Sequence, residues 1–424
     1  MDTEKRALEL KCRRAKEGSR KLSYTTTTIK NAALKNIADD LLLHMPRILE
    51  ANAADQMAAR TAGMNAAMLD RLILTKPRLE AIAADVRNVA DLPDPIGEVF
   101  DMRTLPNGLT IGKKRVPLGV IATIYESRPN VTVDITALCL KVGNAVILRG
   151  GKETIHSNKT LVNVIHGAVG RAGINPEVIQ FIDNTDRALV PYLLRMNDYI
   201  DLVIPRGGAG LIKSVKENST IPVVAGGAGV CHTFVDSSAK IADAVAIIYN
   251  AKVQKPSACN ALDTILVHKE IAAAYLPLMA AELAKAGVEL HVDTASLAVL
   301  SKNSGLKLVA AVEEDWGQEY LALTAAVKVV NSVDEAIEHI ATYGDGHSEA
   351  IITEDYTSAQ RFLNEIDAAA VYVNASTRFT DGAQFGLGAE VGISTQKMHA
   401  RGPLGLKEIT SYKWLVYGSG QVRH

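Results

Sequence analysis

The chain has few cysteines, and their spacing excludes two kinds of stabilised domain. Its 424 residues hold only four, with no C-x-x-C pair. A disulfide framework or a structural zinc site needs suitably spaced thiols, so we expect neither, and we predict no metal. Free thiols persist in a reducing compartment, which favours a cytoplasmic protein.

The sequence also lacks an excess of either charge and lacks long apolar runs. It carries 46 Lys and Arg against 47 Asp and Glu, with no long basic block, so a nucleic-acid partner has little support. No apolar run reaches the ~18 residues of a membrane-spanning helix, and residues 1–6 lack the apolar core of a signal peptide. We therefore expect no nucleic-acid partner and no membrane role.

The length suits two or three domains, and the chain begins with helical patterns. The first hundred residues are rich in alanine and leucine, with Ile29, Ala33 and Ile37 at helical spacing. Two strand-like segments, 99–105 and 109–116, then flank an Asn-Gly pair, which is a strong signal for a hairpin turn. A protruding two-stranded arm is expected there.

After the hairpin, apolar strand segments alternate with helical ones, as in parallel α/β sheets. The first set of predicted strands is 120–124, 145–148, 178–182 and 202–204, with helices at 133–141, 154–172 and 188–195. A second unit begins near Val230, with strands at 264–267, 327–330, 349–353 and 370–373 and helices at 269–286, 333–342 and 357–366. Two α/β units are therefore predicted.

Ligands of open α/β sheets gather at the carboxyl ends of the strands, so the loops there are chemically informative. Two of these loops, 148–154 and 205–210, combine glycines with Arg149, Lys152 and Arg206. Glycines let a phosphate approach backbone amides at a helix start, and the cations suit a dinucleotide, particularly one with a 2′-phosphate. Neither loop is a G-x-G-x-x-G motif, and a glycine turn with a basic residue is more often a plain connection.

The loop 125–131 ends the strand after the hairpin and carries two further candidates. Arg128 can bind a carboxylate or phosphate in a fork, and Asn130 supplies an amide donor for a developing oxyanion. In isolation, a loop Arg and Asn are more often solvated or capping a helix.

Cys259 is the candidate nucleophile, because a turn-like Lys-Pro-Ser-Ala segment delivers it directly before a buried strand. The cations of Lys252 and Lys255, just upstream, can help to lower the pKa of a thiol. Its local sequence supports packing and reactivity about equally, since free cysteines are often buried. Cys231 is a weaker competitor at the start of a buried strand. Cys139 lies in an apolar helical run, and Cys12, in a charged helix, is expected to be exposed.

Five segments taken together resemble the aldehyde dehydrogenase superfamily, and more closely its gamma-glutamyl phosphate reductase branch, over nearly the whole chain. They are 125–132, 143–151, 204–212, 256–260 and 346–351. The resemblance implies an α/β fold of the aldehyde dehydrogenase kind. A Rossmann-like cofactor domain is joined to an α/β catalytic domain and a small β-hairpin oligomerisation arm.

The implied division of the chain is as follows. The NADPH-binding domain takes 1–99 and 119–229, with part of 375–424 returning to it; the arm takes 100–118 and about 408–418; and the catalytic domain takes 230–374. Family members pair through such an arm, and unsatisfied edge strands favour pairing, so a homodimer or tetramer is expected.

The resemblance also implies roles for single residues. Cys259 falls at the catalytic thiol and Asn130 at the oxyanion-hole asparagine. Arg149 falls at a lysine that contacts the adenosine ribose, where arginine favours NADPH, and Glu319 at the glutamate that holds the nicotinamide ribose. The remaining candidates for the cofactor are Gly150, Lys152, Arg206, Gly207 and Gly208. Those for the substrate's phosphate, carboxylate and amino groups, which rest on chemistry alone, are Arg128, Arg378 and Asp381.

One departure from the superfamily indicates which chemistry to expect. Hydrolytic members carry a glutamate that activates water, and the equivalent segment here is Ala225-Gly226-Gly227, with alanine in its place. The alanine disfavours hydrolysis, and this agrees with the reaction that the resemblance implies. That reaction is the reduction of an acyl phosphate, L-glutamyl 5-phosphate, to L-glutamate 5-semialdehyde with NADPH, in the second step of proline biosynthesis from glutamate. A transient contact with glutamate 5-kinase is possible. The alternatives are a hydrolytic NAD(P)-dependent semialdehyde dehydrogenase and a nucleotide-binding scaffold without chemistry.

Overall fold

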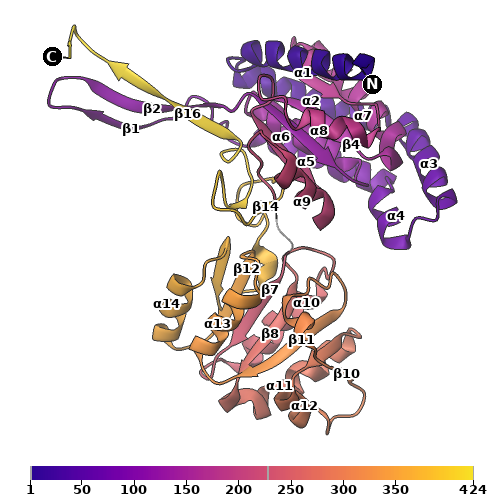
Figure 1. Cartoon of the computed structure of the whole chain (residues 1–424), viewed down its shortest axis with the longest axis vertical. Coiled ribbons are helices and arrows are strands. Elements are labelled where there is room, and N and C mark those ends of the chain that lie inside the picture. Colours follow the sequence, from indigo (N-terminus) through magenta and orange to yellow (C-terminus); the bar gives the residue numbers. More distant parts are fainter. Residues whose placement is uncertain (1, 227–228, 424) are drawn as a thin grey trace. The chain divides into compact units, whose positions relative to one another are not determined.

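The computed structural model describes residues 2–226 and 229–423 and divides into two compact units (Figure 1). Unit 1 holds the chain up to Ala225, the segment Gly386–Gly392 and the chain from Leu404 onward. Unit 2 runs from Gly226 to Phe385 and takes in Ile393–Pro403. Each unit is built around its own sheet.

Unit 1 begins with the helical region that the alanine and leucine spacing predicts. Thr26, Asn65 and Thr75 begin three of the helices by accepting a hydrogen bond from a backbone N–H of the first turn. The helices are α1 (Asp2–Leu22), α2 (Thr27–Leu43), α3 (Met45–Thr61), α4 (Ala66–Leu72) and α5 (Lys76–Asp91).

The prediction that Cys12 is exposed is wrong. Its side chain is fully buried on the same stripe of α1 as Leu8 and Ala15, and this helix packs on the sheet of unit 1. The charged neighbours that suggested exposure lie one position away along the helix and therefore on other faces. Burial raises the pKa of the Cys12 thiol to about 12, so this thiol is not a nucleophile.

The sheet of unit 1 is parallel and has the order β5-β4-β3-β6. Every residue of β3 is buried, which is why its sequence is a nearly continuous apolar run. The strands are β3 (Val120–Tyr125), β4 (Ala145–Gly150), β5 (Ile179–Phe181) and β6 (Leu202–Arg206). The helices that follow them are α6 (Asn130–Lys141), α7 (Ile155–Arg171), α8 (Val190–Leu193) and α9 (Ala209–Asn218). α2 packs over α5, α6 and α7 as an outer layer.

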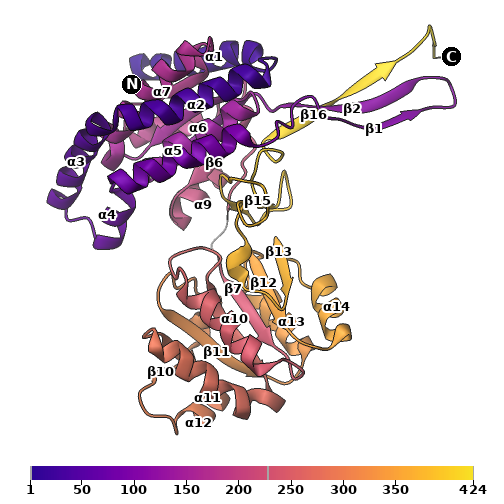
Figure 2. The same ribbon diagram turned by 180° about the vertical axis from the view of Figure 1, so that it is seen from behind.

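The predicted hairpin is confirmed and gains a third strand from the end of the chain. β1 (Val99–Thr104) and β2 (Thr110–Pro117) are antiparallel, and β16 (Thr410–Tyr417) pairs with the other edge of β2. Gly108 closes the turn with φ of 84°, a conformation that favours glycine. Figures 1 and 2 show these strands running out from the rest of unit 1 as an arm.

Unit 2 is a seven-stranded parallel sheet of order β10-β9-β11-β8-β7-β12-β13 with helices on both faces. Its strands are β7 (Cys231–Val235), β8 (Leu262–His268), β9 (Glu289–Val292), β10 (Lys307–Ala310), β11 (Thr324–Val330), β12 (Ser348–Ile352) and β13 (Ala370–Val373). One core holds α10 (Ile241–Val253), α11 (Lys269–Lys285) and α12 (Thr294–Leu300) against the sheet. A second core holds α13 (Val333–Tyr343) and α14 (Tyr356–Glu365).

The α/β fold class, with two parallel sheets and an arm, is therefore confirmed. The sequence reading did not identify α10, α12, β9 or β10. Within residues 2–226 and 229–423, no helix combines the length and the apolar character needed to cross a bilayer.

Candidate active site

Two of the predicted loops of unit 1 meet at the point where the strand order reverses. β3 and β6 are neighbours although two strands, β4 and β5, separate them along the chain, and ligands of open sheets bind at such points. The Glu126 N–H donates to the carbonyl of Arg206 at 3.0 Å. In return, the Gly208 N–H at the start of α9 donates to Oε2 of Glu126, also at 3.0 Å.

This contact explains why a glycine stands at position 207. A Cβ there would lie 2.5 Å from Oε2 of Glu126 and 2.8 Å from Cδ2 of Leu211. The Gly208 amide already holds a carboxylate, so the start of α9 is a place where an anion is stable. Sequence reasoning missed Glu126, whose role depends on a loop 82 residues downstream.

The third loop, after β4, is tied to the same place. Both the N–H and the hydroxyl of Ser127 donate to Oε1 of Glu153, at 2.8 and 2.9 Å, and Ser127 has a positive φ of 46°. Gly150 is buried, and a Cβ on it would lie 2.2 Å from Nδ2 of Asn158. Lys152 is exposed at the start of the short helix η1 (Lys152–Thr154).

Arg149 and Arg206 place positive charge around these loops. Arg149 donates to the carbonyl of Thr185 at 3.0 Å. Burial lowers the pKa of Arg149, and the positive charge of Arg187 lowers it further. Arg206 is half-buried, with Nη1 2.2 Å from where a Cβ on Gly392 would lie. Glycines, a helix start that holds a carboxylate, and neighbouring guanidinium groups fit the phosphates of a dinucleotide.

Asn130 begins α6, and its side chain is held by a residue that the sequence reading did not single out. Nδ2 of Asn130 donates to Oδ2 of Asp134 at 2.8 Å. Burial raises the pKa of Asp134 to about 7 and Asp85 adds to this, while Asn130 and Arg206 act in the opposite direction. The spacing of four residues at a helix start is the signal that could have identified the pair.

Arg128 lies two residues before Asn130 and is half-buried. Its carbonyl accepts the N–H of Val131 at 3.1 Å, which makes the turn that leads into α6.

In unit 2, Cys259 is the exposed thiol among the four cysteines of the chain. It lies in the loop between α10 and β8, where consecutive turns join the Ala258 N–H to the Lys255 carbonyl at 3.1 Å and the Ala261 N–H to the Ala258 carbonyl at 3.0 Å. An exposed thiol in a short, ordered loop is accessible to a small substrate.

Asn260 anchors this loop to the segment that follows β13. Its Nδ2 donates to the backbone carbonyl of Thr380 at 2.8 Å, and its backbone carbonyl accepts a hydrogen bond from the Thr377 hydroxyl at 2.8 Å. Gly229 packs on the other side, where a Cβ would lie 1.7 Å from the Cys259 carbonyl oxygen. The backbone around the thiol is therefore fixed.

Arg378 is the predicted substrate residue that the structure brings close to the thiol. Nε of Arg378 donates to Oε1 of Gln254 at 2.7 Å. Burial lowers the pKa of Arg378, while Cys259 and Asp381 act in the opposite direction. Nδ2 of Asn260, the residue after Cys259, donates to the Arg378 carbonyl at 3.3 Å, so Arg378 lies beside the Cys259 loop.

The expectation that Lys252 assists Cys259 is wrong. Lys252 is fully buried, and its ammonium group donates to the Leu262 carbonyl at 2.7 Å and lies 3.4 Å from Oδ1 of Asp263. Burial lowers the pKa of Lys252. Lys255 is exposed.

Asp381 and Glu319 are placed in the same unit as Cys259. Oδ1 of Asp381 accepts the N–H groups of Ala383 and Gln384, at 3.0 and 3.2 Å, so this carboxylate also closes a turn. Glu319 is half-buried in the loop before β11. The pKa of the buried Asp263 is raised to about 6. Desolvation is the main cause, and the negative charge of Glu319 adds to it.

Cys231, the competing thiol, lies directly behind Cys259. It is fully buried, and its thiol donates to the Cys259 carbonyl at 3.3 Å. Burial raises the pKa of Cys231 well above its ordinary value, and Glu349 adds to this. In residues 2–226 and 229–423, no group of three or more His, Cys, Asp or Glu side chains could hold a metal ion.

The segment that corresponds to the water-activating glutamate offers no base at its described positions. Ala225 is buried, and a Cβ on Gly226 would lie 2.6 Å from the Ile393 carbonyl oxygen. Gly227 lies outside the described residues.

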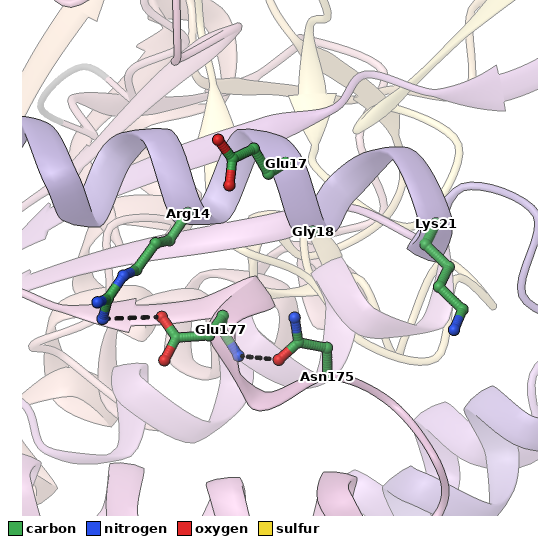
Figure 3. Close-up of a pocket in the computed structure, with 6 residues that line it drawn as sticks. All are labelled: Arg14, Glu17, Gly18, Lys21, Asn175 and Glu177. Atoms are coloured by element: carbon green, nitrogen blue, oxygen red, sulfur yellow. Dashed lines mark hydrogen bonds and ion pairs between the residues drawn. The ribbon is translucent and has the colours of Figure 1, made fainter.

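A pocket of about 410 Å³ on unit 1 is separate from these loops (Figure 3). It lies between α1 and the short helix η2 (Pro176–Val178), which precedes β5, and so at the amino edge of the sheet. Its lining residues are Arg14, Glu17, Gly18, Lys21, Asn175 and Glu177. None of them is a candidate catalytic or cofactor residue.

Comparison with known proteins gives matches over the whole length. The aldehyde dehydrogenase family model matches residues 2–325. A gamma-glutamyl phosphate reductase of Dehalococcoides mccartyi is 68% identical over 416 residues, 98% of each chain. One of Escherichia coli is 54% identical over 409 residues, 96% of this chain and 98% of that one. The crystal structure of gamma-glutamyl phosphate reductase from Thermotoga maritima is similar with a TM-score of 0.95 and 49% identity, covering 98% of this chain and 100% of that one.

Proposed function

Because this chain belongs to the aldehyde dehydrogenase family, we propose that it reduces L-glutamyl 5-phosphate to L-glutamate 5-semialdehyde and inorganic phosphate, in the second step of proline biosynthesis from glutamate. The observation that carries this proposal is the exposed Cys259 thiol, in a loop that Asn260 anchors to the carbonyls of Arg378 and Thr380. Relatives with 54% and 68% identity that are named for this reaction support it.

The first step is acyl transfer to Cys259. The thiolate attacks the acyl carbonyl carbon, a C–S bond forms, and the carbonyl electron pair moves to oxygen. The Asn130 side-chain amide and the Cys259 N–H donate to this oxyanion, which collapses and expels phosphate with the C–O electron pair. A thioester on Cys259 remains.

Members of the family use a nicotinamide cofactor, and we propose NADPH here. Arg149, Lys152 and Arg206, with the glycines at positions 150, 207 and 208, would hold its phosphates, and Glu319 would hold the nicotinamide ribose. When bound, NADPH supplies the hydride that reduces the thioester. The like charges of Arg149 and Arg187 support a preference for a cofactor with a 2′-phosphate, because an additional anion relieves their repulsion.

The chain's residues also complete the reaction and limit hydrolysis. After reduction, the sulfur of Cys259 leaves as a thiolate and the aldehyde is released. Ala225 cannot take a proton from water, so the thioester is protected from hydrolysis. Arg378 and Asp381 are proposed to bind the carboxylate and amino groups of the substrate, and Arg128 its phosphate.

The test is the reverse reaction on L-glutamate 5-semialdehyde, followed as NADP⁺ reduction. Turnover that requires inorganic phosphate is expected. Turnover at the same rate without phosphate would instead support the hydrolytic semialdehyde dehydrogenase. No turnover with either would leave the nucleotide-binding scaffold as the better description.

We also propose that the arm joins two or four copies of this chain. β1 and β16 are the edge strands of the arm, and exposed apolar side chains line it. They are Val99, Met102, Tyr412, Trp414, Val416 and Tyr417. We propose the cytoplasm as the compartment, because a nucleophilic Cys259 thiol that is exposed has to stay reduced. A transient contact with glutamate 5-kinase is proposed because acyl phosphates are easily hydrolysed in water.

A further inference from the structure

We infer that Asp134 is a positioning residue for Asn130, and that its carboxylate selects which end of the Asn130 amide is presented to the oxyanion of the substrate. The inference rests on the proposed function, because it takes Asn130 as an oxyanion donor. It assigns a second residue to that task and predicts a dependence on pH.

The geometry follows from the start of α6. Asn130 and Asp134 are four residues apart and therefore lie on the same face of the helix, one turn from each other. Nδ2 of Asn130 donates to Oδ2 of Asp134 at 2.8 Å, and both side chains are half-buried. An ionised carboxylate only accepts hydrogen bonds, so it holds the NH₂ end of the amide on its own side.

This contact leaves the chemistry of Asn130 intact. The amide NH₂ has two hydrogens, and one remains for an oxyanion when the other is donated to Asp134. If the amide turned over, Oδ1 would face the carboxylate, and two acceptors would repel each other. The ionised Asp134 therefore keeps Asn130 a donor.

Protonation of Asp134 removes this selection. A carboxylic acid can donate its own hydrogen to Oδ1 of Asn130, so both amide orientations become acceptable. Burial raises the pKa of Asp134 to about 7, and the charged groups that face it are Asp85 of α5, which raises it further, and Arg206 at the end of β6, which lowers it. The donor orientation is present above pH 7 and is lost as the pH falls through this value.

The test uses p-nitrophenyl acetate without cofactor and measures the burst of p-nitrophenol released when Cys259 is acylated. This step passes through an oxyanion. Removal of a complete oxyanion donor lowers the rate about 10²- to 10³-fold. Asp134→Asn keeps Asn130 but no longer fixes the orientation of its amide, so it should slow the burst by less, about 10-fold at pH 8.5. The ester concentration that half-saturates the burst should not change.

Iodoacetamide provides a matched reaction without an oxyanion. It alkylates the same Cys259 thiol by direct displacement, so its rate in Asp134→Asn should equal that of the wild-type protein. Equal losses in both reactions would mean that the thiol itself is disturbed, and this would overturn the assignment.

A double variant separates this inference from the proposed function. Asn130→Ala should slow acylation strongly, and Asn130→Ala with Asp134→Asn should be no slower than Asn130→Ala alone, because Asp134 acts through Asn130. If Asn130→Ala acylates at the wild-type rate, the oxyanion role itself is wrong. If Asn130→Ala is slow while Asp134→Asn is as fast as the wild-type protein, only the role of Asp134 is wrong.

Asp85→Asn supplies a test that does not alter the pair. Removal of this negative charge lowers the pKa of Asp134, so the acid limb of the acylation rate should move to lower pH with the rate at pH 9 unchanged. An acid limb that stays in place would contradict the inference, even if Asp134→Asn does not fold.

Discussion

Cys259 and Cys231 show how position alone separates two identical side chains. The thiol of Cys231 donates to the carbonyl of Cys259, so the two residues are in contact. Cys231 is surrounded by protein, and its thiolate would be unstable there, whereas Cys259 is exposed in a loop that contacts the backbone of Arg378. We therefore propose Cys259, which is accessible to water, as the reactive thiol in place of the buried Cys231.

Substitution of each cysteine tests this difference. Cys259→Ser should lose at least about 10³-fold in phosphate-dependent NADP⁺ reduction, because a hydroxyl is a poor nucleophile without a base. Cys231→Ala should retain activity within about 3-fold and lose about 1 kcal/mol of unfolding free energy through the small cavity. Iodoacetamide followed by peptide mass spectrometry should label Cys259 first. Preferential labelling of Cys231 would reverse the assignment.

Arg378→Gln tests the cation at the thiol. We expect KM for the semialdehyde to rise about 10-fold, because a charged contact with the substrate carboxylate is lost. Alkylation of Cys259 at pH 7 should also become slower, since loss of a nearby cation raises the pKa of a thiol. The matched control is Arg361→Gln, on the exposed face of α14, where the ion pairs with Glu365 and Asp334 are peripheral. Equal behaviour of the two variants would remove Arg378 from the site.

Some residues of the candidate site could be predicted from the sequence, and others depend on distant partners. Cys259 and Asn130 stand in motifs that are short and complete in themselves. Asn260, in contrast, donates to a carbonyl 120 residues downstream, and Glu126 accepts a hydrogen bond from an amide 82 residues downstream. No local pattern contains that information, because these contacts exist only after the sheets have formed.

At the scale of elements, the two sheets present their functional loops at opposite edges. In unit 1, the loops after β3, β4 and β6 lie at the carboxyl ends of the strands, as expected for an open parallel sheet. In unit 2, Cys259 directly precedes β8 and Cys231 begins β7, so the nucleophile lies at the amino edge of its sheet. The general rule therefore made the loops of unit 1 candidates for the cofactor, whereas the local sequence of Cys259 supported packing and reactivity about equally and the family resemblance implied its role.

The elements that sequence reading missed lack the usual signal. β10 is only Lys307–Ala310 and is mostly exposed, so it has no buried apolar run. α10 has apolar residues on nearly every face, which hides the helical period, and it packs against β8 and α11. The long amphipathic helices and the fully buried strands were predicted.

The start of α9 allows a prediction about cofactor affinity. The Gly208 N–H donates to the carboxylate of Glu126, and we propose that a cofactor phosphate binds at this same helix start. Glu126→Gln should therefore lower Kd for NADPH about 3-fold, since a like charge is removed at a helix start. The measurement is a titration of NADPH fluorescence.

The control for this prediction lies on the same helix. Glu217 is paired with Lys213 near the other end of α9 and is exposed, so Glu217→Gln should leave Kd unchanged. A rise in Kd for Glu126→Gln would mean that Glu126 supports the loop instead of competing with the phosphate.

At the scale of the whole molecule, the arm has two unlike faces. Trp414 pairs with Lys113 and Tyr412 with Arg115, and Nζ of Lys113 lies 4.7 Å and 5.2 Å from the ring centroids of Tyr412 and Trp414. On the opposite face, Lys413 pairs directly with Lys114. Both faces therefore carry cations, but Lys113 and Arg115 are paired with Asp101 and Glu98, so the aromatic face is the better candidate for assembly.

Trp414→Glu with Val416→Glu should therefore dissociate the assembly. Both residues lie on the aromatic face of β16 and are 50% and 60% exposed, so the substitutions cost little within one copy. The mass from light scattering should fall to that of a single 45.4 kDa chain. Lys413→Ala, on the other face of the same strand, should keep the wild-type mass. If the paired substitution leaves the mass unchanged, the aromatic face is not the interface. If the wild-type protein is already a single chain, the arm has another role.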